Sequence, residues 1–201
     1  CIPTKALLKS AQVYDYLKHV DAYGLKAEAV DKDFSAVIKR SRNVADGMSK
    51  GVQFLMKKNK IDVIDGFGKI KPGHKVDVTA ADGTITEYTA KNIIIATGAR
   101  SKELPNLPQD GKKVIGYREA MSLPKQPKKM IVVGSGAIGV EFAYFYHTMG
   151  TEVTVVEFLP NMVPVEDIDV SKQLERSFKK SGIKVMTNAS VESVDTSGKG
   201  V

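Results

Sequence analysis

The sequence predicts an α/β fold with a small antiparallel sheet near its middle and a parallel sheet toward its carboxyl end. Three observations support this. Apolar residues recur at helical spacing over residues 5–18 and 33–59. The period changes to two over residues 61–89, as in half-buried strands. Strand and helix patterns then alternate from Met130 to Met186, which is typical of parallel strands joined by right-handed crossovers.

The amino-terminal third is expected to form two helices. Pro3 suits the first turn of the first helix, where its missing N–H costs nothing, and Gly24 closes this region. The second helix is expected from about Asp33 to Asn59. Gly47 and Gly51 weaken that helix without breaking it.

Four strands are expected in the middle of the chain. Residues 61–70, 75–79 and 84–89 predict a three-stranded meander, joined through turns at 71–73 and 81–83. Residues 92–96 form a short continuous apolar run, as expected of a strand buried on both faces, which ends at Thr97. Residues 101–128 are rich in proline and predict a linker, with a helical turn near 118–123.

After the linker, strands are expected at 130–133, 153–156 and 183–186, and helices at 137–149 and 170–180. Gly150 and Gly182 stand where helix C-caps belong.

Composition argues against several function classes. The formal net charge of +7 would fit a nucleic-acid binder, but acids separate the lysine pairs and no aromatic-basic motif accompanies them. We therefore expect no nucleic-acid partner. No stretch approaches the roughly 18 apolar residues of a membrane span, so we expect a cytoplasmic protein without a membrane partner. One cysteine and three isolated histidines predict no internal disulfide and no metal site.

Residues Gly134-Ser135-Gly136-Ala137-Ile138-Gly139 match the pattern G-x-G-x-x-G between an expected strand and an expected helix. Gly134 would allow the tight turn, Gly136 the approach of a pyrophosphate, and Gly139 close packing of helix on strand. The helix N-terminus would present free N–H groups and partial positive charge to the phosphates. The pattern predicts a Rossmann-like dinucleotide-binding lobe.

Glu157 ends the second strand of this lobe, 18 residues after Gly139, close to the roughly 20-residue spacing of a ribose-binding acid. A 2′-phosphate about 4 Å from this carboxylate would meet repulsion of about 4 kcal/mol at an effective dielectric constant near 20. No arginine follows in residues 158–161 to offset it. The sequence favours NAD over NADP.

Cys1 begins the segment Cys1-Ile2-Pro3-Thr4-Lys5-Ala6-Leu7-Leu8, at the start of an expected helix. The helix dipole and Lys5 would stabilise a thiolate there. The residues alone leave open whether this cysteine is redox-active or an ordinary isolated one. A chain that starts with cysteine rather than methionine also suggests a fragment.

Three segments carry a family resemblance. The segment that starts at Cys1 resembles the second half of the redox-active segment of dihydrolipoyl dehydrogenases, in which another cysteine lies five residues earlier. Residues 92–99 are similar to the flavin-contacting strand of that family. Residues 134–141 resemble its NAD-binding glycine motif, including the glutamate two positions after the last glycine. The similarity covers essentially all 201 residues.

The resemblance implies roles for individual residues. Cys1 would be the flavin-proximal member of a redox disulfide, and Lys5 and Glu141 would pair beside the flavin as catalytic and cofactor-binding groups. Glu157 would hold the adenosine ribose of NAD. The remaining expected cofactor contacts are Gly68, Thr97, Gly98 and Ala99 for FAD, and Ser135, Ala137, Ile138, Val140 and Val191 with the three glycines for NAD.

The resemblance also implies two incomplete Rossmann-like lobes: residues 1–118 as part of an FAD-binding domain that carries the meander, and 119–201 as part of an NAD-binding domain. The substrate would be dihydrolipoamide on lipoyl domains of 2-oxo acid dehydrogenase or glycine cleavage complexes, and the parent protein would be a homodimer. Its FAD glycine motif and its catalytic histidine–glutamate pair would lie outside these residues, so the chain alone is expected to be inactive.

Two alternatives stay open at this point. Another flavin disulfide reductase, such as a mercuric or glutathione reductase, would share most of these motifs. A non-catalytic nucleotide-binding module would bind a dinucleotide without redox change.

Overall fold

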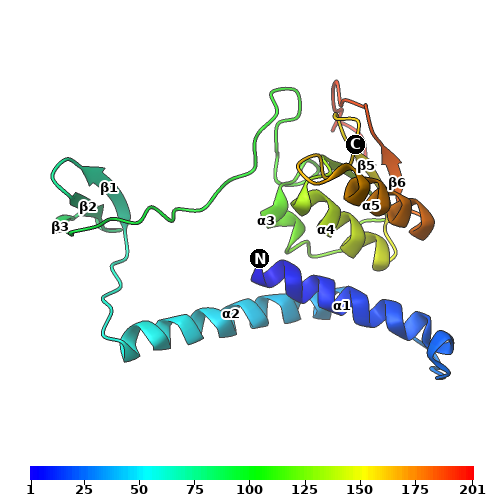
Figure 1. Cartoon of the computed structure of the whole chain (residues 1–201), viewed down its shortest axis with the longest axis horizontal. Helices are drawn as coiled ribbons and strands as arrows, with labels where there is room; N and C mark the ends of the chain where they lie inside the picture. Colours follow the sequence, from blue (N-terminus) through cyan, green and yellow to red (C-terminus); the bar gives the residue numbers. More distant parts are fainter. The chain divides into compact units, whose positions relative to one another are not determined.

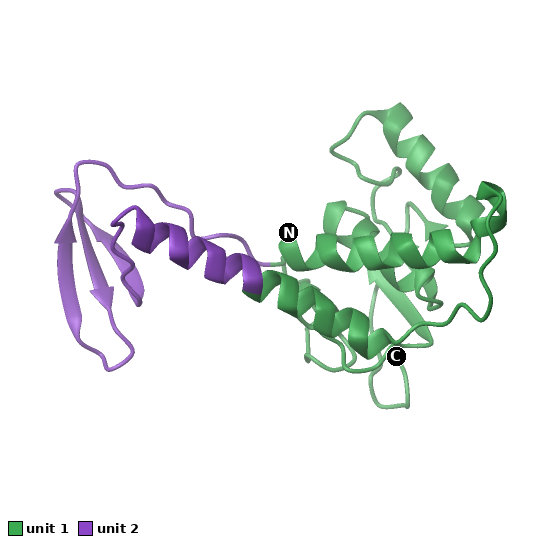
Figure 2. Cartoon of the chain, turned by 90° about the horizontal axis from the view of Figure 1, so that it is seen from below, with its two compact units in different colours: residues 1–46, 101–201 green, residues 47–100 purple.

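The computed structural model describes residues 1–201, which form two compact units (Figure 2). Unit 1 comprises residues 1–46 and 101–201, and unit 2 comprises residues 47–100. The division expected after residue 118 concerns cofactor-binding domains rather than these units, and it stays a prediction.

Unit 1 contains a parallel sheet of strands β4 (Lys129–Val133), β5 (Glu152–Val156) and β6 (Lys184–Met186), in that order. Helix α4 (Ala137–Thr148) connects β4 to β5, and helix α5 (Ile168–Ser181) connects β5 to β6 (Figure 1). Gly150 and Gly182, which follow these helices, both have φ of +94°. The predicted alternation of strands and helices is confirmed.

The hydrophobic core of unit 1 is built around α4. Helix α1 (Ile2–Lys18) packs on α4 (Figure 1), and its Leu7 and Ala11 are completely buried. The short helix α3 (Tyr117–Ala120) adds Ala120 to the same cluster. The other buried apolar residues of the cluster are Phe142, Ala143, Phe145, Tyr146, Met149, Val153, Val155, Met162, Val163, Phe178 and Ile183.

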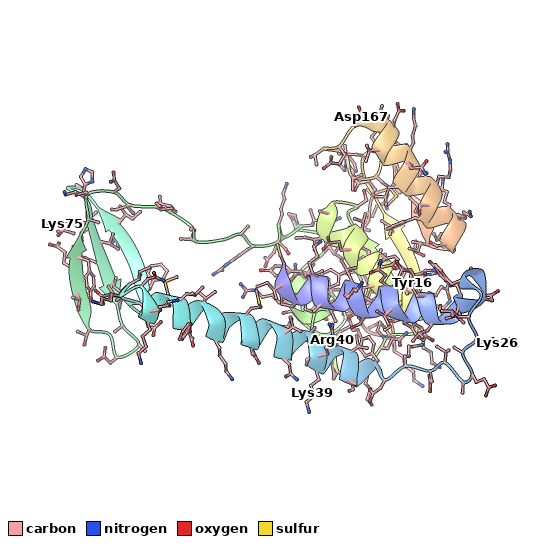
Figure 3. The ribbon with its side chains drawn as sticks, turned by 60° about the horizontal axis from the view of Figure 1, so that its bottom comes forward. Tyr16, Lys26, Lys39, Arg40, Lys75 and Asp167 are labelled. Atoms are coloured by element: carbon pink, nitrogen blue, oxygen red, sulfur yellow. The ribbon has the colours of Figure 1, made fainter.

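Near its N-terminus, helix α2 (Phe34–Lys58) is joined to α1 by hydrogen bonds. Arg40 Nη1 donates to Ala6 O at 2.9 Å and to Ser10 Oγ at 3.2 Å, and Figure 3 shows Arg40 on the part of α2 that runs along α1. Between the two helices, the 3-10 turn η1 (Val20–Tyr23) ends at Gly24, whose φ is +70°. The predicted closure at Gly24 is confirmed.

Unit 2 contains an antiparallel meander of strands β1 (Phe67–Lys71), β2 (Lys75–Thr79) and β3 (Ile85–Thr89). Gly73 and Gly83 take φ of +81° and +86° in the two turns, so both predicted hairpins are confirmed. Lys75, labelled in Figure 3, pairs across the sheet with Glu87 at 2.7 Å.

Two strand predictions are wrong. The strand expected at 61–70 is too long, and the strand expected at 92–96 does not form. Residues 61–65 are not in a strand, and the first strand begins only at Phe67. Residues 92–96 form no strand either, and Ile94 and Ile95 are 90% and 70% exposed. The physical reason is that an apolar run becomes a buried strand only where neighbouring strands supply hydrogen bonds and cover both faces. Neither run pairs with another strand in this structure.

No helix of the structure combines the length and the apolar character needed to cross a membrane.

Replacement of Leu7 tests the packing of α1 on α4. Because the Leu7 side chain is completely buried, Leu7→Ala should lower the free energy of unfolding by about 2–5 kcal/mol, measured by urea denaturation. Val13→Ala on the same helix is the matched control, since Val13 is 44% exposed. Equal losses for the two variants would contradict the described core.

Candidate functional site

The turn between β4 and α4 has the geometry that its three glycines predict. Gly134 has φ of +95°, which L side chains rarely adopt. A Cβ on Gly139 would overlap Gly134 O and lie 3.3 Å from Val132 Cγ1, so α4 packs on the strand only because Gly139 has no side chain. A Cβ on Gly136 would meet nothing within 4 Å, so the backbone there is open to a ligand.

The open turn leads into the N-terminus of α4. Gly136 is the N-cap and no side chain caps the helix. The first N–H groups of a helix have no partner within it, and they carry partial positive charge. This end of α4 therefore fits the pyrophosphate of a dinucleotide.

Glu157 lies directly beside this turn. Its Oε2 accepts hydrogen bonds from Ser135 N and Ser135 Oγ, both at 2.7 Å, and its Oε1 accepts from Leu159 N at 2.9 Å. The residue is 7% exposed. The carboxylate thus points toward the glycine turn, the side on which a ribose-binding acid is needed.

Opposing effects act on the pKa of Glu157. Burial raises the pKa of the carboxyl, but the hydrogen bonds from Leu159 N–H and from the N–H and hydroxyl of Ser135 lower it, with a further contribution from Phe158 N–H. The net result is a pKa below the ordinary value. The carboxylate is therefore ionised at neutral pH.

Val191 follows a segment that runs beside Glu157. Ala189 N–H donates to Glu157 O at 3.0 Å, two residues before Val191. Val191 O accepts a hydrogen bond from Asn106 Nδ2, which fixes the backbone of the segment. Its predicted contact with the cofactor stays a prediction.

Cys1, Lys5 and Glu141 come from two packed helices. Cys1 is the N-cap of α1 and has an exposed, free thiol. Lys5 Nζ of α1 forms an ion pair with Glu141 Oε1 of α4, as the resemblance implied.

The Lys5–Glu141 ion pair is partly exposed to solvent. The side chains of Lys5 and Glu141 are 62% and 30% exposed, so water solvates both charges. The loss of about 3–5 kcal/mol that is typical of breaking a buried pair does not apply here.

The predicted flavin contacts lie in unit 2. Gly68 is in β1, and Thr97, Gly98 and Ala99 belong to an exposed segment without helix or strand. Gly98 has φ of +80° and open space where a Cβ would stand, which is compatible with close approach of a ligand. Because Cys1 belongs to unit 1, the assembly of a flavin site from these residues stays a prediction.

Ser135 makes side-chain contacts in the site that the glycine pattern did not indicate. Ser135 occupies a variable position of that pattern, yet it is fully buried and bonded to Glu157. Its partner lies 22 positions away, and no local signal in the sequence connects the two residues.

Glu157→Gln should make the free energy of unfolding less dependent on pH in the acidic range. The carboxylate is stabilised in the folded state, so its contribution is complete above the ordinary pKa of 4.5 and is lost as the pH falls through the lower folded pKa. The variant should be about 1–3 kcal/mol less stable than the wild type at pH 7, and this difference should shrink at pH 3. Urea denaturation at both pH values measures it. Glu152→Gln, at the start of β5 and with a 68% exposed side chain, is the control. A difference that grows toward low pH would contradict the described hydrogen bonds.

The ion pair between α1 and α4 should contribute little to stability. Because both charges are solvated, Lys5→Met or Glu141→Gln should change the free energy of unfolding by at most about 1 kcal/mol. A double-mutant cycle in urea gives the coupling energy. A coupling above about 3 kcal/mol would show that the pair is buried in solution.

Known proteins are similar to the chain over its full length. Over 201 residues the chain is 48% identical to the dihydrolipoyl dehydrogenase of Chlorobaculum tepidum, covering 100% of the chain and 43% of that protein. It is 41% identical over 202 residues to the leghemoglobin reductase of Vigna unguiculata, covering 100% of the chain and 40% of that protein. The chain therefore spans less than half the length of these relatives.

Solved structures show the same similarity. The crystal structure of LpdA from Mycobacterium tuberculosis superposes with a TM-score of 0.88 at 30% identity, over 98% of this chain and 44% of that one. The HOCl-induced flavoprotein disulfide reductase RclA from Escherichia coli gives a TM-score of 0.72 at 28% identity, over 96% of this chain and 40% of that one. The sequence model of the pyridine nucleotide-disulphide oxidoreductases matches residues 1–201, and the chain belongs to that family.

Proposed function

We propose that the chain is the part of a dihydrolipoyl dehydrogenase that binds NAD and carries one redox cysteine. The whole protein would oxidise dihydrolipoamide to lipoamide with NAD⁺ as the acceptor, through a redox disulfide and FAD. The observation that carries the NAD assignment is the ionised Glu157 carboxylate, bonded to the glycine turn at the N-terminus of α4. The substrate assignment rests on the names of the relatives that cover the whole chain.

Each residue group has its own task in this proposal. The open backbone at Gly136 and the N-terminus of α4 would bind the pyrophosphate, and Glu157 and Val191 would bind the adenosine half. Ser135, Ala137, Ile138 and Val140 would complete that binding segment.

Cys1 would supply the thiolate, and the Lys5–Glu141 pair would set the charge near it. FAD, when bound, would supply the two-electron chemistry, with Gly68 and residues 97–99 among its contacts. Lys5 and Cys1 share the first turn of α1, where the positive end of the helix dipole also favours a thiolate.

The proposal includes the partners and the setting that the resemblance implies. The substrate would arrive on lipoyl domains of 2-oxo acid dehydrogenase or glycine cleavage complexes, and the whole protein would be a cytoplasmic homodimer. Another flavin disulfide reductase is the competing assignment, since RclA shares the fold. A substrate panel that includes dihydrolipoamide, glutathione disulfide and Hg²⁺ separates these possibilities in the whole protein.

The glycine turn provides the direct test of dinucleotide binding. Gly139→Ala would force α4 away from Gly134 and should weaken NADH binding by at least about tenfold, measured by fluorescence titration. Gly51→Ala in α2 is the matched control, because a Cβ there meets nothing within 4 Å. Unchanged NADH affinity in a folded Gly139→Ala variant would refute the proposed site.

The isolated chain of residues 1–201 should bind NADH without turning over dihydrolipoamide. The reason is its length, since it spans 43% of the dihydrolipoyl dehydrogenase that it matches at 48% identity. Measurement of NADH formation from dihydrolipoamide and NAD⁺ tests this. Turnover at the rate of the whole protein would contradict the expectation.

A further inference from the structure

We propose that Ser135 is a positioning residue that holds the Glu157 carboxylate in one orientation and thereby sets the preference for NAD over NADP. This inference rests on the proposed function, because it assigns a specificity device within the same dinucleotide site. The G-x-G-x-x-G pattern leaves this position open to any residue, so the assignment comes from the side-chain contacts.

Two donors of Ser135 converge on one oxygen of Glu157. The Ser135 N–H and hydroxyl both lie 2.7 Å from Oε2, and Ser135 has no exposed surface. Oε1 accepts from Leu159 N, and a carboxylate oxygen has room for about two donors. Oε1 therefore keeps one acceptor direction for a ribose hydroxyl.

A third segment fixes the direction of the serine hydroxyl. Val163 N–H donates to Ser135 O at 3.1 Å and to Ser135 Oγ at 3.2 Å. Because this N–H occupies the acceptor side of Oγ, the hydroxyl hydrogen points to Glu157. Val163 has φ of +40°, which is unusual for a β-branched residue, so its backbone is held in this position at a cost in strain.

The consequence for specificity follows from rotation of the carboxylate. A free glutamate relieves repulsion against a 2′-phosphate by turning its charge away. Here that rotation would break both bonds from Ser135 at a residue that is only 7% exposed. The carboxylate therefore stays where it accepts from a ribose diol and repels a phosphate.

Titration of the protein of residues 1–201 with NADH and with NADPH tests this inference. Ser135→Ala keeps the N–H bond and removes the hydroxyl bond, so the ratio of NADPH to NADH dissociation constants should fall by about tenfold. A purely structural role would weaken both cofactors equally. The acid limb of NADH binding should also move to higher pH, because the ionised carboxylate loses a donor.

Ser171→Ala is the matched control. Ser171 is another buried serine, and its hydroxyl donates to Val163 O at 3.4 Å without touching Glu157. Its cofactor ratio should stay within about twofold of the wild type. Ser135→Cys, which retains a weak donor, should give an intermediate ratio and serves as the test variant if Ser135→Ala does not fold.

The outcomes separate this inference from the proposed function. A wild-type protein that prefers NADH, together with an unchanged ratio in the folded Ser135 variants, would overturn the role of Ser135 and leave the NAD site intact. A wild-type protein that binds neither NADH nor NADPH would overturn both.

Discussion

The hydrogen bonds between Ser135 and Glu157 join the two strand ends on which the site depends. Because β4 and β5 are parallel, the turn after β4 and the residue after β5 come to the same edge of the sheet. Gly134 N–H also donates to Val156 O at 2.8 Å, so the backbone joins the same ends. Without the donors of Ser135, a nearly buried charge would lose most of its hydrogen bonds, which is costly in a region of low dielectric constant.

Helix α4 connects this edge to the rest of unit 1. Its N-terminus forms the glycine turn, while Phe145 and Tyr146 lie at the centre of the core. Glu141, one turn into the helix, reaches Lys5 of α1. A shift of α4 would therefore change the backbone of the glycine turn, the core packing and the charge near Cys1 together. At Gly139 the helix lies so close to the turn that any added Cβ would collide with Gly134 O.

How much the sequence predicts depends on whether an element finds its partners within the described chain. The sequence pattern predicts the strands and helices from Lys129 to Met186 because each strand pairs with a neighbour in the same sheet. Residues 92–96 have the composition of a strand but no strand beside them, so composition alone gave the wrong result. The glycine roles could be read from spacing, whereas the role of Ser135 depends on contacts with residues 22 and 28 positions away. Such contacts exist only once the sheet has formed.

The Lys5–Glu141 pair and the Glu157 carboxylate, both in unit 1, differ in the interactions that fix their positions. Lys5 and Glu141 are solvated, and an exposed pair is worth at most about 1 kcal/mol, so it does not hold α1 on α4. Burial of Leu7 alone is worth about 1.5–3 kcal/mol and is the larger contribution. The pair is therefore free to adjust when charge changes nearby, which is compatible with its proposed place beside the Cys1 thiolate. Glu157 has the opposite character. Its donors and its burial fix the carboxylate, which suits an acid that distinguishes a hydroxyl from a phosphate by position.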